Sequence, residues 1–258
     1  MFRRLLVLGY GVGAYALFLG TFLYAVGFIG GFLTPTQLDG PREGSLAGAV
    51  AADLGLLALF AVQHSGMARP AFKRWLTRFV PHAAERATYV LLSNVALLLM
   101  FVLWRPLGGV VWETEGVTRA AVYAVFAAGW LIVLATTFLI DHFDLFGLRQ
   151  AVLYARGREY TPPRFVTPAP YRWVRHPLYV GWLTVFWAAP TMTAAHLLFA
   201  VVTTAYILAA VKLEERDLVA AHPEYEAYRR RVPMLVPRLR RDPATTAAGH
   251  TKEAQPCG

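Results

Sequence analysis

The sequence predicts an all-α integral membrane protein, with four transmembrane helices followed by a C-terminal helical hairpin. Of the 258 residues, 57% are hydrophobic and only 16% are charged, whereas a soluble domain carries about 45–50% apolar and about 25% charged residues. The apolar residues also form uncharged blocks, several of them near the roughly 20 residues that one helix needs to cross a bilayer. Strands are not expected, because no segment shows sustained alternation of apolar and polar residues.

Four blocks are expected to cross the membrane once each: Leu5–Leu33, Leu46–Val62, Tyr89–Leu103 and Ala120–Ile140. The first is too long for the apolar region of a signal peptide, which has about 7–15 residues, so we expect it to be retained. Asp53 in the second block lies on nearly the same helix face as His64. This placement predicts either a polar cavity reaching into the bilayer or, for Asp53 alone, a packing pair with a neighbour such as Asn94.

The hairpin is expected in the long uncharged segment Leu178–Val211, which is interrupted at Ala189–Thr193. Pro190 in this interruption removes a backbone donor and disfavours a continuous helix. The arm before Pro190 is short. It either begins earlier, near Arg172, or crosses the membrane incompletely.

Lysine and arginine indicate the orientation of the chain. With the N-terminus inside, all but three of the 25 Lys and Arg residues fall in cytoplasmic segments, the exceptions being Arg42, Arg105 and Arg119. This distribution follows the positive-inside rule and predicts that both termini are cytoplasmic. It also accounts for most of the formal net charge of +9, so no nucleic-acid partner is expected.

We expect a single domain over residues 1–241, with a transmembrane part in 1–164 and the hairpin with its C-terminal segment in 165–241. Residues 242–258 are polar and lack an apolar run, which predicts a disordered tail. Cys257 in this tail is the one cysteine of the chain. Its isolation excludes a disulfide framework, a cysteine-based zinc site and an iron–sulfur cluster.

Ionisable residues gather at the expected cytoplasmic ends of the spans. His64 follows the second span, and Asp141-His142-Phe143-Asp144 follows the fourth. Polar residues at this depth usually face a cavity or one another. The candidate catalytic groups are therefore His64, Asp141, His142 and Asp144. The alternative is that the motif is only a charged helix end anchored at the membrane interface. No metal is expected, because the ligand pairs of usual metal sites are missing from the sequence.

The hairpin carries ionisable residues at both of its inner ends. Arg175-His176-Pro177 opens it and Glu214-Glu215 closes it. Because a hairpin brings its ends together, these residues predict one pocket with tyrosine and tryptophan nearby. Such a pocket suits a zwitterionic ligand with a cationic centre, since arginine binds a carboxylate, glutamate an ammonium group and aromatic faces a positive charge.

These residues carry a family resemblance. The pattern Arg175-His176-Pro177-x-Tyr179-x-Gly181, followed by Glu214-Glu215-x-x-Leu218 and Tyr225-x-x-Tyr228, resembles the isoprenylcysteine carboxyl methyltransferase and phospholipid methyltransferase superfamily of membrane enzymes. In that superfamily this segment forms the S-adenosylmethionine site. The resemblance implies these cofactor-binding residues: Arg175, His176, Pro177, Tyr179, Gly181, Glu214, Glu215, Tyr225 and Tyr228.

The earlier part of the chain narrows the resemblance. The stretches 63–70, 85–89 and 104–106 resemble NnrU-like membrane proteins. Together with 141–150 they resemble bacterial methanethiol S-methyltransferases. This resemblance implies methylation of methanethiol to dimethyl sulfide, with S-adenosylhomocysteine as the second product. It also implies an active site at the cytoplasmic side of a bacterial inner membrane, with a small volatile thiol and the lipid bilayer as partners.

Methyl transfer to a thiol requires the thiolate, so a base is expected. His64 or His142 is predicted to accept the proton, oriented by Asp141 or Asp144, and a pair that joins two segments, such as His64 with one of the aspartates, is preferred. Phe143, Phe146 and Trp173 are predicted to wall a narrow acceptor pocket. The alternatives are another small thiol, a lipid or a prenylated cysteine as acceptor, or a non-enzymatic membrane protein of the NnrU type.

Overall fold

The computed structural model describes residues 1–162 and 166–237, and the predicted tail over 242–258 lies outside them. Within the described residues, five helices are long and apolar enough to cross a membrane. They are α1 (Phe2–Gly30), α2 (Leu46–Ala68), α4 (His82–Leu103), α5 (Gly116–Ile140) and α9 (Ala194–Ala221). The predicted helical membrane class is confirmed, and each predicted single span coincides largely with one of these helices.

Several helices extend beyond the predicted apolar blocks, and α2 and α4 do so near His64. Helix α2 continues to Ala68 instead of ending at Val62, and α4 begins at His82 instead of Tyr89. Both extensions add polar residues at the end of the bundle where His64 lies. Backbone hydrogen bonding does not stop where the apolar run stops, so hydropathy alone underestimates the length of these helices.

Shorter helices connect the long ones: α3 (Pro70–Leu76), α6 (His142–Leu145), α7 (Leu148–Ala155), the 3₁₀ turn η1 (Ala169–Arg172), α8 (Pro177–Trp187) and α10 (Glu224–Arg231). Helix α8 is the first arm of the predicted hairpin. Its 11 residues reach about 16 Å, whereas the hydrocarbon core of a bilayer is about 30 Å thick. The arm thus begins at Pro177 rather than near Arg172, and α8 alone is too short to cross.

The expectation that the chain forms no strands is wrong for two short segments. Strands β1 (Val110–Glu113) and β2 (Thr191–Thr193) pair in antiparallel orientation, and the Thr114 amide donates to the Pro190 carbonyl at 2.8 Å. Strand β2 occupies the break between α8 and α9, where the backbone groups released from helix need other partners. Strands this short give no alternation that a sequence pattern can reveal.

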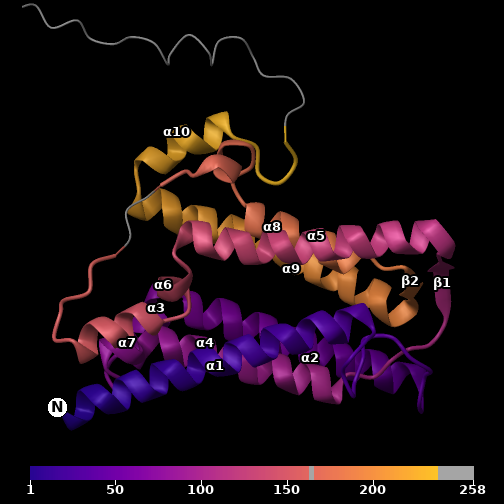
Figure 1. Ribbon diagram of the computed structural model, residues 1–258, viewed down its shortest axis with the longest axis horizontal. Helices are drawn as coiled ribbons and strands as arrows, with labels where there is room; N and C mark the ends of the chain where they lie inside the picture. Colours follow the sequence, from indigo (N-terminus) through magenta and orange to yellow (C-terminus); the bar gives the residue numbers. More distant parts are fainter. Residues whose placement is uncertain (163–165, 238–258) are drawn as a thin grey trace, which may run out of the picture.

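The helices form two layers, which Figure 1 shows from the side. Helices α1, α2, α4 and α7 make one layer, in which α4 contacts both α1 and α2 and α7 packs on α1. Helices α5, α8 and α9 make the other layer, with α10 on its far side. Helices α2 and α9 contact each other across the two layers. The pair β1–β2 lies at the end of the bundle opposite the start of α1.

Two glycines let α5 and α8 approach closely. A Cβ atom on Gly129 would lie 3.0 Å from the backbone nitrogen of Val185, and one on Gly181 would lie 2.9 Å from that of Val133. Small residues at such crossings allow backbone-to-backbone packing of membrane helices. Gly181, which the resemblance assigned to the cofactor, thus faces α5.

Asp53 has a structural partner at the end of the bundle opposite His64. Its side chain is fully buried, and its Oδ1 accepts a hydrogen bond from the Arg105 amide at 2.9 Å. Asn94 instead donates to the Val90 carbonyl of its own helix at 2.8 Å. The packing interpretation of Asp53 fits this contact, but its partner is the backbone that follows α4 rather than Asn94.

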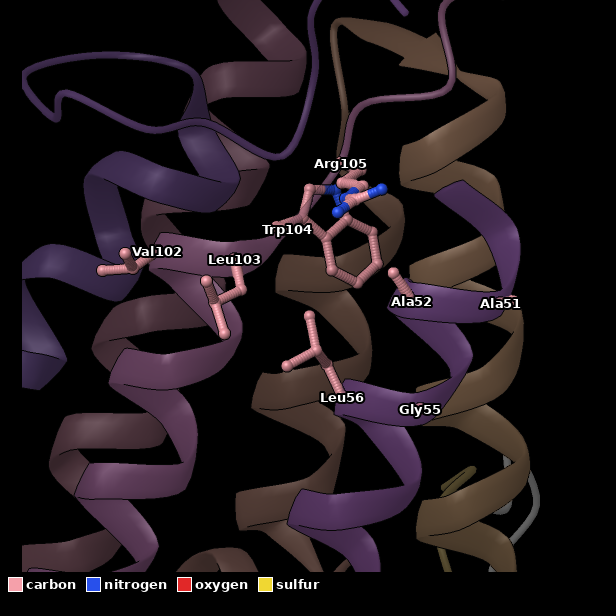
Figure 2. A pocket seen from close by; sticks show the side chains of 8 residues that line it. All are labelled: Ala51, Ala52, Gly55, Leu56, Val102, Leu103, Trp104 and Arg105. Atoms are coloured by element: carbon pink, nitrogen blue, oxygen red, sulfur yellow. The ribbon is translucent and has the colours of Figure 1, made fainter. Parts of the chain in front are cut away.

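A groove of about 550 Å³ lies between the first half of α2 and the end of α4 (Figure 2). Its lining is mostly small and apolar: Ala51, Ala52, Gly55, Leu56, Val102, Leu103, Trp104 and Arg105. His64 lies on the other half of α2, so the groove is separate from the predicted ionisable cluster.

The glycine crossing predicts a stability difference between two matched substitutions. Gly129→Ala should lower the free energy of unfolding by about 1–3 kcal/mol, because the added methyl group overpacks the α5–α8 contact. Gly13→Ala is the control, since a Cβ atom there meets nothing within 4 Å. Thermal unfolding of the two variants in detergent measures the difference. Equal midpoints would show that the crossing is not close-packed.

Candidate active site

A cavity of about 250 Å³ lies where the end of α5, the start of α8, the end of α9 and α10 converge. Six of the nine residues that the resemblance assigned to the cofactor line it: Arg175, His176, Tyr179, Glu214, Tyr225 and Tyr228. Tyr171, Leu218 and His222 add to the wall, and Leu139 and Ile140 contribute from α5. The hairpin therefore brings together the groups at its two inner ends.

Glu215 connects three elements beneath this cavity. Its Oε1 accepts hydrogen bonds from Arg175 Nε at 2.6 Å and from the Tyr225 hydroxyl at 3.3 Å, and it lies 3.0 Å from His176 Nε2. The residue is only 8% exposed. A buried carboxylate with this many partners is tied to the protein, so Glu215 holds the site in shape rather than facing a ligand.

Arg175 fastens the segment that follows α10. Its Nη1 donates to the carbonyl oxygens of Arg229 at 3.0 Å and Val232 at 2.5 Å. The backbone amides of Arg175 and His176 donate to the carbonyl oxygens of Pro233 and Met234. Arg175 was predicted to bind the carboxylate group of a ligand. It also has a structural role, because its Nε and Nη1 already donate to groups of the protein.

Glu214 is the carboxylate that faces the cavity. Its side chain is 45% exposed, and its Oε2 accepts a hydrogen bond from the Tyr179 hydroxyl at 2.9 Å. His176 Nδ1 lies 4.0 Å from the same oxygen. The two neighbouring glutamates therefore differ. Glu215 is bonded to Arg175, His176 and Tyr225, whereas Glu214 is available to a bound ligand.

Neutral tyrosines complete the cavity wall. The Tyr228 hydroxyl donates to the Tyr171 carbonyl at 2.6 Å, and burial raises the pKa of Tyr228 to about 12. Burial, together with the nearby Glu214 carboxylate, also raises the pKa of Tyr171. These phenols stay protonated near neutral pH and present uncharged aromatic faces beside Glu214. The combination favours a cationic ligand.

His64 lies in a second cluster, between α2, α4 and α9. Its Nδ1 is 3.2 Å from the Ser93 hydroxyl, and its Nε2 is 2.9 Å from the Tyr89 hydroxyl. Both ring nitrogens thus contact hydroxyl groups, and the predicted pair of His64 with Asp141 or Asp144 does not form. The neighbouring Ser65 hydroxyl lies 3.0 Å from that of Tyr206, which connects this cluster to α9, the helix that carries Glu214.

The Asp141–Asp144 segment forms a third cluster, which fastens α6 and α7 to α1. His142 Nε2 lies 2.8 Å from the Tyr15 hydroxyl, and burial lowers the His142 pKa. Asp144 accepts hydrogen bonds from Arg149 at 2.8 Å and from Tyr160 at 3.1 Å. These contacts match the alternative of an anchored helix end.

Asp141 starts α6, with its Oδ1 accepting from the Asp144 amide at 3.2 Å. Two of the residues predicted to line the acceptor pocket also belong to this cluster. Phe146 stacks on Phe18 with 3.6 Å between ring centroids, and Phe143 contacts Phe138. Trp173, the third predicted wall, is 58% exposed.

Sequence reasoning missed several polar residues that the structure places near His64 or in the cavity. Tyr89, Ser93 and Tyr206 stand in apolar runs, where a hydroxyl-bearing residue is a weak signal of a buried polar site. Tyr171 precedes the Arg175 motif and could have been assigned with it. The residues of α5 that line the cavity, Leu139 and Ile140, carry no chemical signal at all.

Comparison with known proteins identifies the family of the chain. The phospholipid methyltransferase family matches residues 122–223, the part of the chain that includes the hairpin. The methanethiol S-methyltransferase of Crocosphaera subtropica is 57% identical over 236 residues, which cover 91% of this chain and 92% of the relative. The chain belongs to the methanethiol S-methyltransferase family.

Another member of the family, methanethiol S-methyltransferase 2 of Bradyrhizobium diazoefficiens, is 53% identical over 240 residues, 93% of each chain. Nurim of Bos taurus is a more distant relative, 34% identical over 176 residues, or 64% of this chain and 66% of nurim. No solved structure matches the chain. Family membership and the five long apolar helices identify an integral membrane protein of the methyltransferase class.

The contacts of Arg175 predict how the C-terminal segment is held. Arg175→Met should release α10, because breaking a buried ion pair leaves Glu215 without its charge partner, a loss of about 3–5 kcal/mol. Brief trypsin digestion followed by mass spectrometry should show cleavage at Arg229–Arg231 at least tenfold faster than in the parent protein. Arg119→Met, which removes an exposed ion pair with Glu113 at 3.8 Å, should leave the rate unchanged. Equal rates for the two variants would contradict the role of Arg175.

Proposed function

We propose that the protein methylates methanethiol to dimethyl sulfide, using S-adenosylmethionine as the methyl donor. The observation that carries this proposal is the cavity of the hairpin, in which Glu214 faces a wall of neutral tyrosines. Membership in the methanethiol S-methyltransferase family supports the acceptor.

The lining of the cavity fits the donor chemically. A Glu214 carboxylate that keeps a 45% exposed side chain can accept hydrogen bonds from an ammonium group or from sugar hydroxyls. The faces of Tyr171, Tyr179 and Tyr228 attract a positive sulfur centre. When bound, S-adenosylmethionine supplies a methyl group on a cationic sulfur, which becomes a neutral thioether as the thiolate forms the new carbon–sulfur bond.

Other residues of the chain hold the site in shape and accept the proton of the thiol. Arg175 and Glu215 hold α8, α9 and the segment after α10 together, so that Glu214 and the tyrosines keep a fixed geometry around the donor. We assign His64 as the base that accepts the proton of the thiol. A free cysteine thiol titrates near 8.5, so a base that removes the proton increases the reactive thiolate. Productive transfer requires the two reacting atoms about 3–3.5 Å apart and in line.

The orientation is part of the proposal. Helix α10 and the end of α9 lie toward the same end of the bundle as the start of α1 (Figure 1). Arg3, Arg4, Lys73 and Arg74 belong to segments at that end. This clustering of positive charge supports cytoplasmic termini and an active site at the cytoplasmic side of a bacterial inner membrane.

A lipid or prenylcysteine acceptor is less well supported. The phospholipid methyltransferase match covers residues 122–223, which contain most of the donor cavity. The relatives named for methanethiol match nearly the whole chain, including the His64 cluster. A non-enzymatic role would not require Glu214 to be kept facing a cavity that the rest of the hairpin holds in shape.

Purified protein in detergent, given methyl-labelled S-adenosylmethionine and methanethiol, should release labelled dimethyl sulfide, measurable by gas chromatography. Glu214→Gln should weaken S-adenosylmethionine binding about tenfold or more by calorimetry, because a charge-assisted hydrogen bond is worth about 1.5–3 kcal/mol. Glu226→Gln is the matched control, since Glu226 pairs only with Arg229 and Arg230 on α10 within the described residues. Absence of labelled product with the parent protein would refute the function.

A further inference from the structure

The polar cluster around His64 has members that the proposed reaction has not yet used. Gln63 Nε2 donates to the Ser93 hydroxyl at 3.3 Å and to Met67 Sδ at 3.1 Å. His64 Nδ1 lies 3.2 Å from the same Ser93 hydroxyl. The amide of Gln63 and the imidazole of His64 therefore meet at one serine, on the side of α2 that faces α4.

The side-chain carbonyl oxygen of Gln63 lacks a hydrogen-bond donor. Its Oε1 is buried and has no hydrogen-bond partner among the residues that the structure describes. A buried acceptor without a donor costs about 1–3 kcal/mol, so a molecule that brings a donor to this position is favoured. A small thiol, whose one polar hydrogen is the S–H, matches a site in which one acceptor is left without a donor.

Aromatic rings close the cluster on its other side. Phe60 stacks on the His64 ring with 5.0 Å between centroids, and Tyr206 of α9 meets Phe60 edge-on at 6.2 Å. The Tyr206 hydroxyl bonds to Ser65 at 3.0 Å, which fixes its ring. Phe60 and Tyr206 are therefore placed where they could limit the size of an acceptor bound beside His64.

The cluster adjoins the donor cavity. Tyr206 of the cluster and Glu214 of the cavity belong to the same helix, α9, and are eight residues apart, or about 12 Å along its axis; Tyr179, which lines the cavity, donates to Glu214. An ion pair of Arg69 with Asp217 at 2.9 Å joins α2 to α9 beside the cluster. A molecule bound at His64 and a donor in the cavity would thus lie beside neighbouring stretches of α9.

From these contacts we propose that Gln63, His64, Phe60 and Tyr206 form the binding site of the thiol acceptor. The inference rests on the proposed methyl transfer and deepens it. Gln63 Oε1 accepts the hydrogen bond of the bound thiol and positions it, while Phe60 and Tyr206 exclude longer chains. The S–H then turns to a ring nitrogen of His64, which takes the proton, and the electron pair stays on the thiol sulfur. That pair forms the new bond to the methyl carbon as the bond from this carbon to the sulfonium sulfur of the donor breaks, and the electrons of the broken bond leave on S-adenosylhomocysteine.

The test measures kcat and KM for methanethiol, ethanethiol and propanethiol at saturating S-adenosylmethionine. Gln63→Met should raise the KM for methanethiol about tenfold, and His64→Gln should lower kcat by about 10²–10⁴, both with unchanged donor affinity.

Phe60→Ala should raise the kcat/KM ratio of propanethiol to methanethiol at least tenfold, since one methylene is worth about 10–200-fold in a closed pocket. Phe60→Leu gives a smaller change in the same direction and replaces Phe60→Ala if that variant does not fold.

Phe22→Ala is the matched control, because Phe22 is a partly buried phenylalanine that packs on Trp130, outside the His64 cluster, and its loss should leave the acceptor preference unchanged. A parent protein that makes no dimethyl sulfide overturns the proposed function itself. A parent protein that turns over methanethiol, with unchanged KM in Gln63→Met and unchanged preference in the Phe60 variants, overturns the acceptor site alone.

Discussion

The arrangement of the site depends on one buried carboxylate. Glu215 is only 8% exposed and must be compensated, because an unpaired charge at this depth is costly. Arg175 and His176 at the start of α8 and Tyr225 on α10 provide the compensation. By doing so they bring three elements, distant in sequence, to one point. Glu214, the preceding residue of the chain, is thereby directed into the cavity.

The proposed reaction would join two clusters built from different layers of the bundle. The donor cavity lies in the layer of α5, α8 and α9, whereas His64 and Gln63 project from α2 in the other layer. Tyr206 bonds to Ser65 beside His64, and Tyr179 bonds to Glu214 in the donor cavity. An apolar thiol dissolved in the bilayer and a charged donor from the cytoplasm could in this way reach neighbouring sites without sharing an entrance.

The sequence predicted the spans, the hairpin and the pocket at its ends, because each depends on local composition and on the fact that a hairpin joins its own ends. It did not predict that Glu214 and Glu215 differ, since their difference arises from Arg175 and Tyr225 in space. The pairing of His64 with an aspartate was also wrong, because α6 turns Asp144 toward Arg149 and Tyr160. Gly181 was assigned to the cofactor by motif, although its lack of a side chain serves the α5–α8 crossing.

The central claim is that the methyl donor binds in the hairpin cavity. Ultraviolet crosslinking of labelled S-adenosylmethionine to the purified protein, followed by peptide mapping, tests it most directly. We predict that the label attaches within 166–179 or 214–228, the segments that contribute most of the cavity wall, and that excess S-adenosylhomocysteine prevents it. Label confined to the α2–α4 groove of Figure 2, or label that the competitor does not reduce, would contradict the claim.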